Sequence, residues 1–251
     1  MILLTLVFIT NSCSKQDIVS VNDATPIKIQ DIGVLHNEGL DFVYKEIIIL
    51  KKEKPSISNQ EIKNNLSQLV LDFGKTKNSN TAYLENYKTQ SDISISYELF
   101  EGSNLKLKAR LADVLTKEQE NFINEIFFIT NSFDGTNASS VISSLKALEP
   151  KISSFSNEDR PPLIAGLQTG ISSTQYWADH ADEWILLLQS TRGSKVNSSK
   201  GLFSWAAVLK ADIEGAISGA VGTVITGGGV ALGALGGAVG GSAASAISQL
   251  L

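Results

Sequence analysis

The C-terminal segment limits most strongly how this chain can fold. Residues 215–251 contain no charged side chain. Two rows of glycines recur there at every fourth position: Gly229, Gly233, Gly237 and Gly241 in one row, and Gly215 and Gly219 in the other. On a helix, small residues four apart form a smooth face that a second backbone can approach closely. We therefore predict a Gly/Ala-rich helical hairpin over 202–251, with its turn at 227–229.

The sequence does not decide whether this hairpin lies in a membrane or inside the protein. Glycine disfavours an isolated helix by about 1 kcal/mol relative to alanine, so packing or lipid must compensate. The stretch 215–235 is long enough to span a bilayer. Few of its residues are large and apolar, however, and the stretch is only weakly hydrophobic. Association with membrane or with like chains is one interpretation, and close packing inside the protein is the other.

The N-terminus reads as an export signal. Met1–Thr10 is an uncharged apolar run, too short for a membrane-spanning helix but of the length of a signal-peptide core. Asn11, Ser12 and Cys13 follow it directly. Because Cys13 is the only cysteine, no intramolecular disulfide can form. We predict a signal peptide over 1–12 and a polar tether over 13–30.

This N-terminal pattern resembles the processing site of bacterial lipoproteins, in which a small residue precedes the lipidated cysteine. The resemblance implies lipid on Cys13 and a location in the cell envelope, most simply as an outer-membrane lipoprotein. Thr10 departs from the usual Leu, Val or Ile, and no Lys or Arg precedes Cys13. Either the true start lies further upstream or the signal is unusual. The alternative to a lipoprotein is an N-terminal core helix or strand with an incidental cysteine.

Between these ends, the pattern predicts an all-α bundle over 31–190. Apolar residues recur at helical spacing along most of it. Ser58 with Glu61, and Thr116 with Gln119, have the spacing of capping boxes that begin helices. Residues 78–100 fit a helix or a strand, and the helical neighbours favour a helix.

Prolines and small residues mark the later boundaries. We expect a helix over 137–148 that Pro150 ends. Another begins near Pro161 and runs through Ile171, followed by a second or a kinked helix to Leu188. The Ser/Gly/Lys-rich stretch 191–201 reads as a linker to the hairpin.

Several short patterns in the bundle resemble those of uncharacterised Bacteroidota lipoproteins. Residues 32–44 contain Leu-His-Asn and then Leu-Asp, and Ser172 or Ser173 precedes Tyr176-Trp177. In this chain and in those lipoproteins, a Gly/Ala-rich tail follows an acidic residue. The tail also resembles the glycine-zipper hairpins of bacterial envelope proteins and bacteriocins. The resemblance to these lipoproteins implies a location in the cell envelope and an all-α fold. It implies no enzymatic reaction.

Composition and motifs exclude several function classes. The net charge of −5 argues against nucleic-acid binding. We find no nucleophile motif and no phosphate-binding loop, and we expect no cofactor and no enzymatic activity. His36 and Glu38 are two apart and do not share a helix face, so a role in tying helices together is the simpler interpretation.

Three hypotheses for function follow. The first is a non-enzymatic, lipid-anchored envelope protein whose glycine-zipper tail associates with membrane or with a second copy. The second is a secreted, bacteriocin-like toxin that permeabilises membranes. The third is a metal protein or enzyme that uses His180 with Asp179 and Glu183, since His180 and Glu183 are three apart and can face one direction.

Overall fold

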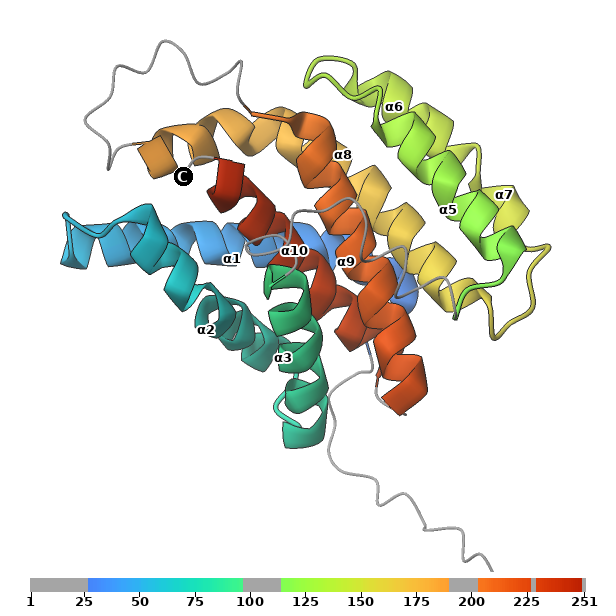
Figure 1. Cartoon of the computed structure of the whole chain (residues 1–251), viewed down its shortest axis with the longest axis horizontal. Helices are drawn as coiled ribbons and strands as arrows, with labels where there is room; N and C mark the ends of the chain where they lie inside the picture. Colours follow the sequence, from blue (N-terminus) through green and yellow to red (C-terminus); the bar gives the residue numbers. More distant parts are fainter. Residues whose placement is uncertain (1–26, 97–113, 190–202, 227–228, 250–251) are drawn as a thin grey trace, which may run out of the picture.

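Helices make up the described part of this chain. The computed structural model describes residues 27–96, 114–189, 203–226 and 229–249, and within these ranges it holds helices and no strand (Figure 1). The all-α class is confirmed. After a short 3-10 turn, Ile29–Asp31, the helices are α1 (Ile32–Glu53), α2 (Asn59–Lys77), α3 (Thr81–Ser96), α5 (Lys117–Thr130), α6 (Ala138–Lys146), α7 (Glu149–Ile152), α8 (Arg160–Gln189), α9 (Trp205–Thr226) and α10 (Val230–Gln249).

Both predicted capping boxes are confirmed. The Ser58 hydroxyl accepts from the Glu61 amide while the Glu61 carboxylate accepts from the Ser58 amide, at 3.2 and 2.9 Å. Thr116 and Gln119 make the same pair of contacts at the start of α5. These reciprocal bonds satisfy amides that the first turn of a helix leaves without partners.

The structure also resolves the ambiguous boundaries. The segment that fitted either a helix or a strand is helical as far as Ser96, where α3 ends. The two pieces expected after Pro161 are one continuous helix, α8. The prediction that Pro150 ends a helix over 137–148 is wrong in one respect: α6 ends at Lys146, and Pro150 lies in the first turn of the short helix α7. A first turn tolerates proline because its amides need no intrahelical partner.

Helix α10 forms the centre of the bundle. Helices α1, α2, α3, α8 and α9 all pack against it, and every residue from Ala231 to Ile247 is buried. Helices α5, α6 and α7 lie along the outer side of α8, away from α2 and α3 (Figure 1). Of the described helices, α10 alone has the length and apolar composition to cross a membrane.

Glycines set the distance between α9 and α10. Gly215 faces Gly237 and Gly219 faces Gly233, so the two helices run antiparallel. A Cβ atom at Gly233 would lie 2.6 Å from the Gly219 carbonyl oxygen, closer than real Cβ contacts come. Only a hydrogen atom fits between these two backbones. Both helices therefore need glycine at every fourth residue along the contact.

Some predictions fall on residues outside the described ranges. These are the signal peptide 1–12, Cys13 with the first part of the tether 13–30, the linker 191–201 and the turn at 227–228.

Candidate functional site

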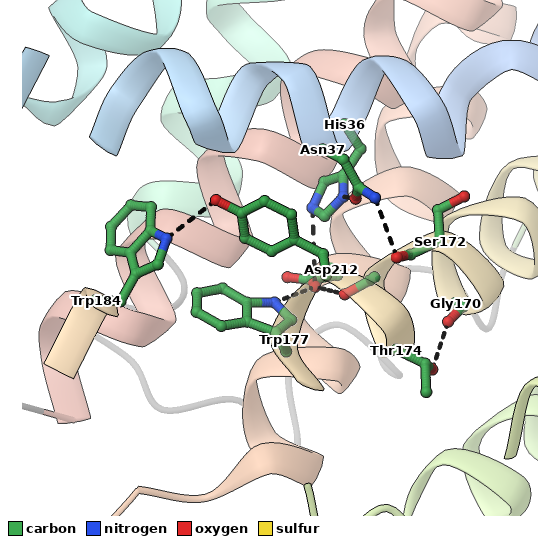
Figure 2. A network of polar contacts seen from close by, with 10 residues as sticks. His36, Asn37, Gly170, Ser172, Thr174, Trp177, Trp184 and Asp212 are labelled. Carbon is green, nitrogen blue, oxygen red and sulfur yellow. Dashed lines mark hydrogen bonds and ion pairs between the residues drawn. The ribbon is translucent and has the colours of Figure 1, made fainter. Parts of the chain in front are cut away.

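The polar residues that converge inside the bundle come from three helices. Helix α1 supplies His36 and Asn37, helix α8 supplies Ser173 and Trp177, and helix α9 supplies Asp212 (Figure 2). The side chains of His36 and Asp212 have no solvent exposure. A polar cluster at such a position needs internal hydrogen bonds, because water is not available to it.

Asp212 is the centre of this cluster. Its Oδ2 atom accepts a hydrogen bond from the Ser173 hydroxyl and another, of 3.0 Å, from the Trp177 indole nitrogen. The same Oδ2 atom lies 3.7 Å from Nε2 of His36. The contacts tie α9 to both α8 and α1, so the cluster fixes how these three helices meet.

The hydrogen bonds of Asn37 define the tautomer of His36. The Asn37 amide nitrogen donates to the Ser172 carbonyl at 3.1 Å, which leaves its oxygen 3.0 Å from Nδ1 of His36. Nδ1 must therefore carry a hydrogen, and Nε2 of the neutral ring presents a lone pair toward Asp212. At 3.7 Å, Nε2 and Oδ2 are too far apart for a hydrogen bond, and Nε2 of His36 and Oδ1 of Asp212 are buried with no hydrogen-bond partner among the described residues.

Burial moves the pKa values of this pair in opposite directions. It lowers the pKa of His36 to about 4, although the contact with Asn37 works against that shift. It raises the pKa of Asp212 to about 7, while the hydroxyls of Ser173 and Ser242 and the Trp177 indole favour the charged form. Both shifts favour the neutral side chains, because a charge is costly where no water reaches it.

The cluster has the residue types of a catalytic triad without the geometry. Ser173 donates to the carboxylate of Asp212 and not to the imidazole of His36, so the serine–histidine hydrogen bond of a triad is missing. His36, Ser173 and Asp212 are all fully buried. The arrangement joins helices, which matches the interpretation of His36 made from the sequence, and Glu38 turns away to pair with Lys77.

Aromatic side chains extend the cluster along α8. The Trp184 indole donates to the Tyr176 hydroxyl at 3.1 Å, and the rings of Trp177 and Trp184 lie 5.7 Å apart (Figure 2). Both tryptophans are fully buried. The seven-residue spacing places them on one stripe of the helix.

The acidic segment of α8 does not assemble a metal site among the described residues. Nδ1 of His180 lies 3.3 Å from a Glu183 carboxylate oxygen, and Asp179 accepts from Gln175 instead. His180 is 40% exposed, and no group of three or more His, Cys, Asp or Glu side chains converges anywhere in the described helices.

A surface hollow of about 360 Å³ lies on the outer face of α5. Asn121, Asn124, Glu125, Phe128 and Ile129 line it. The Phe128 ring is 81% exposed, and Glu125 already pairs with Lys151.

The six glycines singled out in the sequence occupy different positions. Besides the two facing pairs, Gly241 lies against the Ala211 carbonyl of α9, and Gly229 lies at the start of α10 with ordinary van der Waals distance to Tyr83. Five of the six therefore serve close helix contacts, and Gly229 does not.

Sequence reasoning missed Asp212 as a member of the cluster. Its signal is present: Asp212 is an acid among Val208, Leu209 and Ile213, in a helix whose other large side chains are mostly apolar. Searches against protein-family models, curated proteins and solved structures gave no match for this chain.

Proposed function

We propose that this chain is a non-enzymatic, lipid-anchored protein of the bacterial cell envelope, and that α9 and α10 form one glycine-zipper hairpin that contacts the membrane. The observation that carries the proposal is the position of α10. The helix has the length and composition of a membrane span, yet 94% of that span is buried inside the bundle. A chain built in this way keeps an apolar helix out of water until a membrane is available.

The composition of α10 supports a second use beyond core packing. The helix contains no charge, and its small residues leave few large side chains to interlock with the helices around it. Small-residue faces are the surfaces through which helices associate inside membranes. In the bundle these faces are occupied by α9 and α3, so contact with lipid requires the bundle to open.

The buried cluster supports a role without catalysis. His36, Ser173 and Asp212 meet where no substrate reaches them, and their contacts join α1, α8 and α9. We interpret the cluster as a structural lock of the bundle.

The lipid anchor rests on the sequence around Cys13. A single acyl chain binds membranes only marginally, whereas two or more anchor a protein stably. With diacylglyceryl on its sulfur, Cys13 would hold the bundle close to the bilayer surface through the tether 14–30.

Metabolic labelling with an alkyne fatty acid tests the anchor. We expect label on the wild-type chain and on Ser20→Ala, a matched change within the tether, and no label on Cys13→Ala. The intact mass of the mature protein should place its N-terminus at Cys13 with the lipid attached. An unlabelled wild-type chain with residues 1–12 intact and a free thiol rejects this part of the proposal.

A second candidate function is that of a secreted, bacteriocin-like protein that permeabilises membranes. The charge-free, enclosed α10 favours it as well. The two candidates differ in their effect on dye-filled vesicles of phosphatidylethanolamine and phosphatidylglycerol. A permeabilising protein releases the dye, whereas an anchored protein leaves the vesicles sealed.

A further inference from the structure

Helix α3 is the most polar part of the cover around α10. The buried residues of α3 are Tyr87, Gln90, Ser91, Ser94 and Ile95. Only two of these are apolar, whereas the buried face of α8 carries several leucines and both Trp177 and Trp184. Burial of apolar area is what holds such helices together, so α3 gains the least from its position.

Three hydroxyl groups of α3 are buried without a hydrogen bond to any described residue. These belong to Tyr87, Ser91 and Ser94, none of which is more than 6% exposed. When α3 separates from α10, water can bond to these groups. Each such group shifts the balance toward the open state by about tenfold, since an unsatisfied buried hydroxyl loses the bonds it makes to water.

The contact between α3 and α10 is close. A Cβ at Gly236 would lie 2.6 Å from the Tyr87 carbonyl oxygen, and one at Gly240 would lie 3.0 Å from the Ser91 carbonyl oxygen. Backbone therefore meets backbone along this seam, which we define as Tyr87, Ser91 and Ser94 on α3 with Gly236 and Gly240 on α10. The ring of Tyr87 is the one large side chain of the seam, and it packs against Gly236 and against Gly74 of α2. Separation exposes a smooth, charge-free face of α10.

We propose that α3 is a detachable cover, and that lipid acyl chains replace it on the Gly236–Gly240 face of α10. This inference rests on the membrane contact proposed above. The face has no charged or strongly polar group to offer a protein partner, and it belongs to the one described helix that is long and apolar enough to cross a bilayer.

Amide hydrogen exchange of the lipid-anchored chain tests whether α3 separates from α10, independently of whether lipid takes its place. The α3 amides should exchange through an opening that leaves α8 protected. Ser91→Ala removes one unpaired hydroxyl and should slow α3 exchange by about tenfold. Ser143→Ala, the same change at an exposed site on α6, should leave it unaltered. Exchange of α3 only together with α8, or no effect of Ser91→Ala, overturns the inference.

A disulfide across the seam tests the consequence for lipid. A Cβ at Gly240 lies 3.0 Å from the Ser91 hydroxyl oxygen, so a disulfide between Ser91→Cys and Gly240→Cys would join α3 to α10 across the seam. Lipid on the sulfur of Cys13, as proposed above, would leave the introduced pair as the only thiols of the mature chain. The control is Ser91→Cys alone, which carries the same change on α3 and cannot form the bond.

The readout is covalent labelling of α10 by a photoactivatable lipid in phosphatidylethanolamine–phosphatidylglycerol vesicles. We expect α10 to be labelled in the reduced seam variant and in the control under either redox condition, and to lose most of its label when the seam is oxidised. Equal labelling of oxidised and reduced seam variants overturns the cover and leaves the proposed function standing. Crosslinks between two copies of α10 in place of lipid label also overturn it. No label in any chain rejects the membrane function, and the exchange experiment then decides whether α3 opens.

Discussion

Gly219 on α9 and Gly233 on α10 are in backbone contact, with the Gly219 carbonyl oxygen 2.6 Å from the position of a Cβ on Gly233. The central pair of helices therefore depends on the absence of side chains at this crossing. Intrinsic helix propensity would make alanine better than glycine by about 1 kcal/mol at such sites. The close crossing predicts instead that alanine at these sites destabilises the protein.

We expect Gly219→Ala to lower the free energy of unfolding by about 2 kcal/mol or more, because the added methyl group meets backbone that cannot turn away. Gly229→Ala is the matched control, since its Cβ would meet Tyr83 at an ordinary 3.4 Å. Urea denaturation of both variants measures the difference. A stabilised Gly219→Ala protein contradicts the close crossing.

The pair of His36 and Asp212 makes a specific prediction about pH. Between pH 4 and 6.5 the folded pair holds one proton, with the imidazole neutral and the carboxyl group protonated. The unfolded chain also holds one, on the imidazolium, because its carboxylate is ionised. The stability of the wild-type protein should therefore have no net pH dependence from this pair, although both pKa values are strongly shifted.

Single substitutions should reveal the two opposed contributions. In Asp212→Asn, His36 remains with a lowered pKa, so stability should fall by up to about 3 kcal/mol as the pH drops from 6.5 toward 4. In His36→Gln, Asp212 remains with a raised pKa, so stability should fall by up to about 4 kcal/mol as the pH rises from 4 toward 7.

Thermal unfolding across this pH range, compared with the wild type, measures both slopes. Slopes of opposite sign in the two variants support opposed pKa shifts at His36 and Asp212. Slopes of the same sign, or two flat profiles, are incompatible with it.

The caps make a more local prediction. Ser58→Ala should destabilise the protein by about 1 kcal/mol, because the Glu61 amide loses its acceptor and the reciprocal bond loses its geometry. Ser56→Ala, an exposed change two residues earlier in the turn, should be close to neutral. Chemical denaturation of both variants gives the comparison, and equal effects count against the capping box.

Local signals explain how much of the fold could be predicted from the sequence. Ser58 with Glu61 and Thr116 with Gln119 carry their structural meaning within four residues, and both caps are present. The ambiguity of α3 has a physical cause, because its inner face is so polar that apolar periodicity is weak. Pro150 was misplaced because a proline after a helix and a proline in the next first turn differ by only a few residues.

The candidate site could not be predicted in the same way. His36, Ser173 and Asp212 are far apart in the sequence, and only the packing of α1, α8 and α9 brings them together. The acidic segment around His180 looked richer in chemistry, yet its side chains pair locally on an exposed face. The glycine rows predicted close helix contact, but they left open whether α10 would pack inside the bundle or associate with membrane or a second copy.

Photolabelling of the wild-type, lipid-anchored chain tests whether α9 and α10 contact the membrane. The chain is reconstituted into vesicles that contain a diazirine lipid and irradiated, and the labelled peptides are mapped by mass. We expect label to concentrate in residues 205–249, with little in α5, α6 and α8. Label that avoids α9 and α10, or that spreads evenly over the outer helices, contradicts that contact and leaves α10 as a core helix only.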